Sequence, residues 1–336
     1  MKKKIKYTWI ILSVILLITI VLSLGWGSYQ IAFSDIWKIL VGQGTKMQNI
    51  AVFTLRLPRI ITAMLVATAL SIAGALLQGI TKNDLADAGI IGINAGASLA
   101  AVLFIFSQGS LYYQAMGNAS IMILPIIALL GAFLSAGLIY FISSSRDIHP
   151  QRLLLTGIGV NIAINACIMF LTFQGSTQDY NRVLVWTSGS LWGSGWIYAL
   201  SILPIVIIVT GLVMYHHKTL DILQLKDELA ISLGVSVEKE RKRFLCYAII
   251  LAGGATAVAG NISFLGLLGP HIAKSMVGTK HKHYLPVSIL ISMIIIVVAD
   301  SVSRNLFSPI EIPAGITISL IGVPYFIYLM LKEKSL

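Results

Sequence analysis

The residue types that perform chemistry in enzymes are sparse here and do not fall into catalytic patterns. The sequence contains neither a Gly-x-x-x-x-Gly-Lys-Ser/Thr phosphate loop nor the His-Glu-x-x-His pattern of zinc peptidases. His271, His281 and His283 gather in one region, but lysines surround them and no Cys, Asp or Glu lies close by in the sequence. We interpret them as part of a solvated loop. We therefore expect no catalytic residue, no metal site and no cofactor bound by this chain.

One short charged stretch has the pattern of a docking element. Leu225, Leu229 and Leu233 recur at positions i, i+4 and i+8, and Gly234 follows directly. This spacing places the three leucines on one stripe of a helix, and glycine readily adopts the left-handed conformation that ends a helix. Such a helix either docks into a groove of a soluble partner or lies on a membrane surface, and the pattern alone leaves both alternatives open.

The elements that must position this stretch are membrane helices. Apolar residues make up 57% of the 336 residues and charged residues only 11%, whereas a soluble domain carries about 25% charged residues. Spanning structures in lipid are helices or closed barrels, and the unbroken apolar run from Thr8 to Leu24 lacks the alternation of a barrel strand. The sequence predicts an all-α polytopic membrane protein with a single transmembrane domain over residues 1–336.

A bilayer core about 30 Å thick requires roughly 20 apolar residues per helix, and we expect about ten such helices. Their predicted ranges are 8–25, 57–79, 89–107, 120–142, 152–173, 192–215, 243–261, 263–277, 285–304 and 313–331, the eighth being short and rich in glycine. The segment before the second span is amphipathic around 33–41 and is predicted to lie along the membrane surface. Glycines such as Gly74, Gly253 and Gly266 lie in the spans, where small residues let helix backbones approach closely.

Charge predicts the orientation of these helices. With ten spans, 18 of the 24 lysines and arginines fall on one side, together with both termini. Such an excess marks the cytoplasmic side, so we expect a multi-pass protein of the bacterial cytoplasmic membrane with both termini in the cytoplasm. The longest cytoplasmic loop covers 216–243. The net charge of +11 is explained by these loops, and no nucleic-acid partner is expected.

The predicted spans contain few residues that could couple movement of a solute to a proton or sodium gradient. Ionisable residues deep in the spans are nearly absent, although proton- and sodium-coupled transporters depend on buried carboxylates. The sequence therefore argues against a secondary transporter that works without an ATPase.

Several motifs resemble the iron-siderophore and cobalamin permease family of ABC importers. They are Arg56-Leu-Pro-Arg59, Ala73-Gly-Ala-Leu-Leu-Gln-Gly79, Asn83-Asp-Leu-Ala-Asp-Ala-Gly89, Phe264-Leu-Gly-Leu-Leu-Gly-Pro-His271 and Glu311-Ile-Pro-Ala-Gly315. The family usually has proline where this chain has Asp84. The spacing of Glu228, Ala230 and Gly234 resembles the motif by which importer permeases bind their ATPases. The resemblance extends from about Leu55 to Leu331.

The resemblance implies a cobalamin-permease-like fold of the type II importers, paired with a second identical or homologous permease. It also implies two ATPase subunits, which bind the ATP and Mg²⁺, and an extracytoplasmic substrate-binding protein. By resemblance, Arg56, Arg59 and Arg304 receive acidic residues of the binding protein. Arg304 can also pair with Asp300 one helical turn away.

Two further sets of residues carry over from the family. Asn83 and Leu85 resemble the cytoplasmic gate, with 149–151 as a neighbouring loop. Asn161 and Asn165 lie one turn apart on the fifth span, where they either line the path or bond a neighbouring helix. The implied function is the import of ferric siderophore complexes, with iron carried as the chelate; cobalamin and haem are the alternative cargoes within the family.

Overall fold

The computed structural model describes residues 2–27, 29–108, 117–143, 150–306 and 310–333, and every regular element in these ranges is a helix. The helices are α1 (Lys2–Gly25), α2 (Phe33–Leu40), α3 (Lys46–Asn49), a π-helical stretch (Ile50–Arg56), α4 (Leu57–Thr81), α5 (Ala88–Ile91), α6 (Ile93–Gln108), α7 (Gly117–Ser143), α8 (Pro150–Gln174), α9 (Thr177–Thr187), α10 (Trp196–Tyr215), α11 (His217–Leu223), α12 (Asp227–Ser232), α13 (Val237–Ala259), α14 (Leu265–Val277), α15 (His281–Asn305) and α16 (Ala314–Glu333).

All ten predicted spans fall on helices, but they differ in length. Eight helices of the described chain are long and apolar enough to cross a membrane. The predicted span 89–107 is instead divided at Gly92, which has a φ of 90° and separates α5 from α6. The eighth predicted span is the 13-residue α14. The ten-span count is therefore approximate, because two of these segments are shorter than a full crossing.

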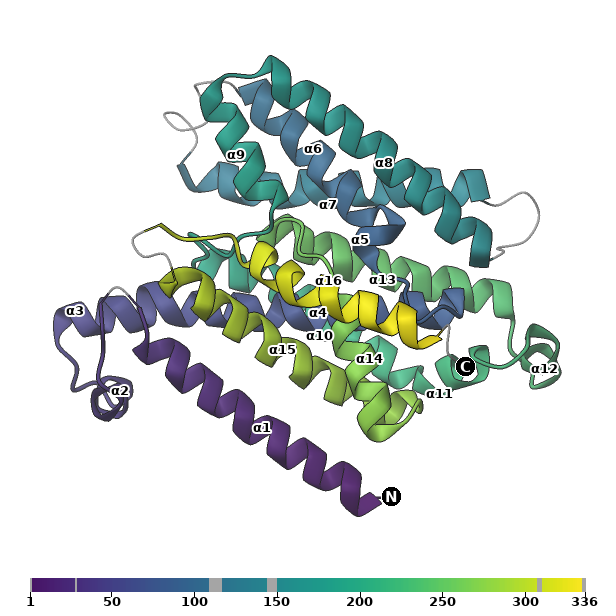
Figure 1. Cartoon of the computed structure of the whole chain (residues 1–336), viewed down its shortest axis with the longest axis horizontal. Helices are drawn as coiled ribbons and strands as arrows, with labels where there is room; N and C mark the ends of the chain where they lie inside the picture. The colour runs from purple at the N-terminus through teal and green to yellow at the C-terminus, as the bar shows by residue number, and fades with distance from the viewer. Residues whose placement is uncertain (1, 28, 109–116, 144–149, 307–309, 334–336) are drawn as a thin grey trace.

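Helix α4 forms the centre of the molecule. It packs against α10, α13, α14 and α15, and 83% of the most apolar window of its span is buried, against 17% in α8. Figure 1 shows α4 running along the long axis, with α2 and α3 at one end and α11 and α12 at the other. Helix α1 begins and α16 ends toward the end that carries α12 (Figure 1).

The helix that contains α4 begins earlier than the sequence predicts. A continuous helical segment extends from Lys46 to Thr81, with seven π-helical residues, Ile50–Arg56, just before α4. The amphipathic stretch before it forms α2, and its location along the membrane surface stays a prediction. Arg56 therefore lies inside a helix rather than at the mouth of a span. A π-helical stretch rotates the residues that follow it relative to an ideal α-helix, and such stretches are frequent at functional sites.

Close helix packing explains two of the glycines in the spans. A Cβ atom on Gly74 of α4 would lie 2.0 Å from the backbone oxygen of Gly266 in α14. A Cβ on Gly266 would in turn lie 2.8 Å from the backbone oxygen of Leu70. The two helix backbones are therefore in direct contact, as expected where small residues replace side-chain packing in lipid.

Candidate functional site

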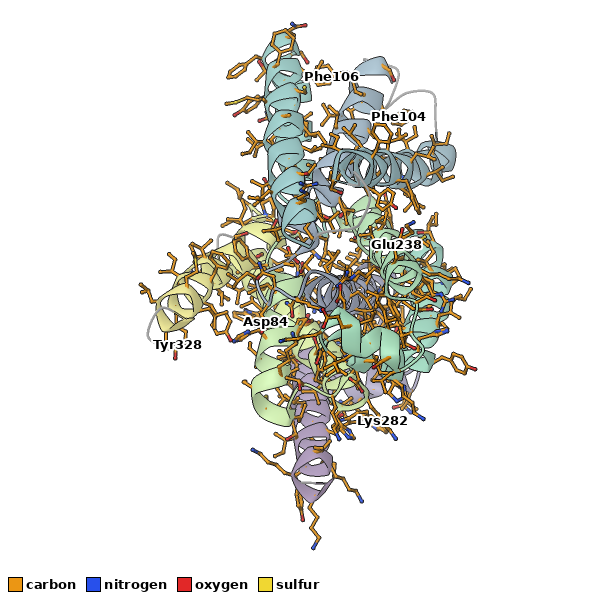
Figure 2. The ribbon with its side chains drawn as sticks, turned by 90° about the vertical axis from the view of Figure 1, so that its right-hand side faces the viewer. Asp84, Phe104, Phe106, Glu238, Lys282 and Tyr328 are labelled. Atoms are coloured by element: carbon orange, nitrogen blue, oxygen red, sulfur yellow. The ribbon has the colours of Figure 1, made fainter. Side chains whose placement is uncertain are left out.

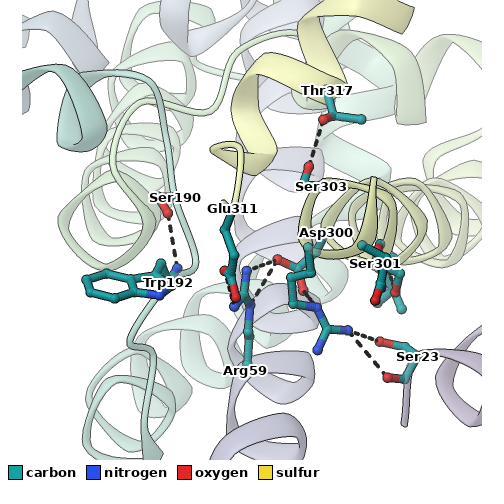
Figure 3. A network of polar contacts seen from close by, with 12 residues as sticks. Ser23, Arg59, Ser190, Trp192, Asp300, Ser301, Ser303, Glu311 and Thr317 are labelled. Atoms are coloured by element: carbon teal, nitrogen blue, oxygen red, sulfur yellow. Dashed lines mark hydrogen bonds and ion pairs between the residues drawn. The ribbon is translucent and has the colours of Figure 1, made fainter. Parts of the chain in front are cut away.

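An arginine cluster lies at the end of α4 that adjoins the π-helical stretch. Arg59 Nε and Nη2 donate to Asp300 Oδ1 of α15 at 3.0 and 2.8 Å, and its Nη1 donates to Glu311 Oε2 at 2.8 Å. Figure 3 shows Arg59 between these two carboxylates. The Asp300 side chain is only 2% exposed, whereas that of Glu311 is 32% exposed. Arg59 is thus held by one buried and one accessible carboxylate.

The other two predicted rim arginines also have partners within the chain. Arg304 Nε lies 3.4 Å from Asp300 Oδ2, and Arg304 Nη2 donates to Ser23 Oγ at 2.9 Å. The predicted pairing of Arg304 with Asp300 is therefore present. Arg56 donates to the backbone oxygens of Leu24 and Tyr29, at the end of α1 and just beyond it. All three arginines are buried, which the sequence did not predict.

The predicted docking element at the opposite end of α4 is a helix. Glu228 is exposed and Ala230 is buried on the six-residue α12. Gly234 has a φ of 83°, and Val235 N donates to the oxygen of Ala230 at 3.1 Å, as in a Schellman helix end. Leu229 and Leu233 are 53% and 60% exposed. The helix is therefore fixed by one small buried residue and presents an apolar face to its surroundings.

Helix α12 is attached to its neighbours by charges. Asp227 Oδ1 lies 2.7 Å from Lys82 Nζ and 2.9 Å from Arg241 Nη2. Lys82 Nζ also donates to the oxygen of Leu225 at 2.6 Å. Burial raises the pKa of Asp227, but the hydrogen bonds from Lys82 and Arg241 outweigh this effect and place the pKa below its ordinary value. Asp227 is therefore held in its ionised form.

The predicted gate residues form one tight turn after α4. Asn83 Oδ1 accepts from the backbone N–H of Leu85 at 2.9 Å, and the N–H of Ala86 donates to the oxygen of Asn83 at 3.1 Å. Asp84 lies within this turn and pairs with Lys274 Nζ of α14 at 2.6 Å. Figure 2, which looks onto this end of the molecule, shows Asp84 near its middle with Glu238 and Lys282 farther out. Of the neighbouring segment 149–151, which was predicted to be a loop, residue 149 lies outside the described residues, and residues 150 and 151 are the first two residues of α8.

The histidine group is not the solvated loop that we expected. His281 is fully buried at the start of α15, and its Nδ1 lies 2.6 Å from Asp221 Oδ1 of α11. The prediction failed because Asp221 is 60 residues away in the sequence and is brought in by folding. Hydrogen bonds from His281 lower the pKa of Asp221 although its partial burial raises it. This pair attaches α11 to α15.

The two asparagines of α8 contact each other and a neighbouring helix. Asn165 Nδ2 donates to Asn161 Oδ1 at 2.7 Å, and Asn161 Nδ2 donates to the oxygen of Gly89 in α5 at 3.0 Å. Bonding to a neighbouring helix is thus confirmed for Asn161. Asn165 is exposed on a helix that is otherwise little buried, so a role in lining the path stays a prediction.

The described residues contain no group of three or more His, Cys, Asp or Glu side chains placed to hold a metal ion.

Comparison with known proteins identifies the family of this fold. The sequence profile of the FecCD transport family matches residues 15–332. The chain belongs to the FecCD transport family. Among its relatives, the iron(3+)-hydroxamate import system permease protein FhuG of Bacillus subtilis is 42% identical over 99% of this chain and 100% of its own length. The Fe(3+) dicitrate transport system permease protein FecD of Escherichia coli is 38% identical over 83% of this chain and 84% of its own length.

A solved structure supports the same assignment. An ABC transporter of the metal-chelate type, captured in an inward-facing conformation, superposes with a TM-score of 0.82 and 28% identity, covering 98% of this chain and 99% of that one. This FecCD-family chain is accordingly a multi-pass membrane permease subunit with the type II importer fold, and a transport component rather than an enzyme.

The turn at Asn83 contains Asp84 at the position where the resemblance to the family predicts proline. Asp84 is the second residue of a four-residue turn closed by the Ala86 N–H, a position where proline is favoured. The family residue and Asp84 therefore both suit the turn. Asp84 additionally supplies the carboxylate that pairs with Lys274. No single-sequence signal indicates this pair, because 190 residues separate its members.

Proposed function

We propose that this chain forms the membrane path of an importer for ferric siderophore complexes and that a separate ATPase drives it. The observation that carries the proposal is the 42% identity to an iron(3+)-hydroxamate permease across essentially the whole length of both chains. The iron travels as its chelate. The chain contributes the path, while ATP and Mg²⁺ bind to the ATPase partner.

The ATPase docks, in this proposal, on the exposed face of α12 around Glu228, Ala230 and Gly234. Its support is the exposed carboxylate of Glu228 next to the uncovered side chains of Leu229 and Leu233. An apolar patch rimmed by charge on a water-facing helix is typical of a protein interaction site. A helix lying on the membrane would direct the same leucines into lipid.

The binding protein docks at the arginine cluster. Arg59 is the member best suited to exchange partners, because the Glu311 carboxylate that occupies Nη1 is partly exposed. An acidic residue of the binding protein would replace Glu311 in an equivalent charge-assisted hydrogen bond from Arg59 Nη1. Arg56 and Arg304, which hold Leu24, Tyr29 and Ser23, shape the rim around it.

The complete transporter in this proposal contains two permeases, two ATPases and one extracytoplasmic binding protein. The permease is one transmembrane domain, with α12 and both termini in the cytoplasm and the arginine cluster outside. The little-buried α8, with Asn161 and Asn165, lines the path between the permeases. Asn83 and Leu85 form the cytoplasmic gate.

Reversal of one charge on α12 tests the coupling assignment. Glu228→Arg should weaken co-purification of the cognate ATPase by about tenfold or more, corresponding to roughly 1.4 kcal/mol, because a favourable interface charge becomes repulsive. Asp35→Arg makes the same charge change on the exposed α2 at the other end and serves as the matched control. Unchanged ATPase binding by Glu228→Arg would refute the docking assignment.

A further inference from the structure

Lys82 connects the two cytoplasmic elements of the proposed mechanism. It is the residue that ends α4, and the gate turn begins with the next residue, Asn83. Its side chain reaches α12, where Nζ lies 2.7 Å from Asp227 Oδ1 and 2.6 Å from the oxygen of Leu225. Asp227 immediately precedes Glu228. One side chain therefore bridges the proposed ATPase-docking helix and the proposed gate.

The backbone of Lys82 is unusual for a residue with a side chain. Its φ is 50°, in the left-handed region, and among the described non-glycine residues only Lys82 and Phe264 have positive φ. Helices that end in this conformation normally use glycine or asparagine there. An unfavourable backbone kept by a particular side chain points to a function for that side chain. The bonds to Leu225 and Asp227 supply one.

The bridge belongs to a network rather than a single exposed ion pair. The side chains of Lys82 and Asp227 are 31% and 46% exposed, so their attraction alone contributes little to stability. Arg241, whose side chain is 7% exposed, holds the same Asp227 oxygen. Asp227 is thus fixed from α13 and α4 together, and a displacement of α12 must either move Lys82 or break its bonds.

The gate turn is built to follow Lys82. The side chain and backbone oxygens of Asn83 accept hydrogen bonds from the N–H groups of Leu85 and Ala86, respectively. Because these bonds fix the turn internally, a movement of Lys82 should displace the turn as a unit. On its other side, Asp84 is held by Lys274 of α14. Lys82 and Asp84 therefore attach the turn to α12 and α14, respectively.

We propose that Lys82 is a positioning residue that transmits displacement of α12 to the gate turn 83–86 through its bonds to Asp227 and Leu225. The inference rests on the proposed docking of an ATPase on α12. It adds a specific connection from that helix to the gate.

The test uses the assembled transporter, reconstituted in proteoliposomes with its ATPase and binding protein and supplied with a ferric trihydroxamate chelate. The readout is the number of chelates imported per ATP hydrolysed. Lys82→Gly removes the bonds while favouring the left-handed backbone, and it should reduce this ratio roughly tenfold, within the usual range of coupling between sites. Lys82→Arg, which keeps the positive charge, should retain most of the wild-type ratio.

Two further variants separate transmission from a merely structural role. In a double-mutant cycle, the effects of Lys82→Gly and Asp227→Asn should be less than additive, because both changes break the Lys82–Asp227 bond, whereas the bond to Leu225 is lost only in Lys82→Gly. Lys242→Ala removes the Lys242–Glu238 ion pair of α13, whose side chains are more exposed than those of Lys82 and Asp227, and it should leave the ratio of chelate imported to ATP hydrolysed unchanged. Lys82→Asn, which also tolerates the left-handed region, replaces Lys82→Gly if the glycine variant does not assemble.

The outcomes are distinguishable. Wild-type chain that binds no ATPase would overturn the proposed function and this inference together. Wild-type chain that binds ATPase and transports, with Lys82→Gly giving the wild-type ratio, would overturn the inference alone. Equal losses of assembly, hydrolysis and transport in Lys82→Gly, with an unchanged ratio, would show that Lys82 only caps α4.

Discussion

At the scale of single residues, Asp300 organises the arginine cluster. Its carboxylate, 2% exposed, pairs with Arg59 through one oxygen and with Arg304 through the other. A buried charge of this kind is tolerated only when it is paired. Glu311 completes the coordination of Arg59 from the partly exposed side. The cluster therefore has one buried carboxylate and one partly exposed carboxylate on Arg59.

The different exposure of Asp300 and Glu311 leads to opposite predictions for two substitutions. Glu311→Gln should strengthen docking of the binding protein several-fold, because Arg59 loses its internal competitor, whereas Arg59→Glu should weaken docking by at least tenfold. The weakening should be larger at low salt, where charges are less screened. Binding-protein affinity for the purified permease at two ionic strengths measures both effects.

Lys38→Glu, an exposed charge reversal on α2, is the control for net charge at this end of the molecule. Equal affinities of the Glu311→Gln and wild-type proteins for the binding protein would show that no carboxylate of the binding protein replaces Glu311 on Arg59.

The sequence identified most of these residues but not their partners. Arg56, Arg59 and Arg304 were recognisable by resemblance, and the Asp300–Arg304 pair by its spacing of four on a helix. Arg59–Asp300 joins residues 241 apart, and Lys82–Asp227 joins residues 145 apart. Such pairs depend on how helices pack, which local periodicity does not encode. For the same reason, Asp221 beside His281 went unpredicted.

At the scale of elements, α4 joins the two ends of the protein. Its 25 residues correspond to about 37 Å of helix, somewhat more than the hydrocarbon core of about 30 Å. Arg59 lies near one end and Lys82 terminates the other. Packed against α10, α13, α14 and α15, α4 connects the arginine cluster with the turn at 83–86.

The contact of α4 with α14 should be sensitive to one methyl group. Gly74→Ala places a Cβ atom against the backbone of Gly266, and overpacking of this kind costs about 1–3 kcal/mol. We expect a lower midpoint of thermal unfolding in detergent. Gly211→Ala in α10, where a Cβ meets nothing within 4 Å, should leave the midpoint unchanged or slightly higher. Equal midpoints for both variants would contradict the proposed tight contact.

Element prediction succeeded where hydrophobicity was continuous and failed where the backbone departs from an ideal helix. The long spans follow directly from apolar run length. The helix break at Gly92 and the π-helical stretch Ile50–Arg56 are not accompanied by a change in residue composition. Hydropathy therefore gives no sign of either feature. The segment 237–243, which is charged at every position after Val237 and was assigned to a loop, forms the first turns of α13, because a helix that leaves the membrane continues to satisfy its backbone hydrogen bonds.

At the scale of the whole molecule, the chain has two different polar ends joined by an apolar helical body. One end carries buried arginines with an exchangeable carboxylate, and the other carries a short exposed helix linked to a turn by Lys82. This asymmetry suits a protein that binds different partners on its two sides. The described residues contribute neither a nucleotide-binding loop nor a metal cluster to this arrangement.

The most direct test is uptake of a radiolabelled ferric trihydroxamate into proteoliposomes that contain this permease. Uptake should occur only when the ATPase, ATP on the ATPase side and the binding protein on the opposite side are all present. The chelate should also accumulate against its own gradient. Uptake by the permease alone, without ATPase or ATP, would refute the proposed function and favour an ATPase-independent carrier.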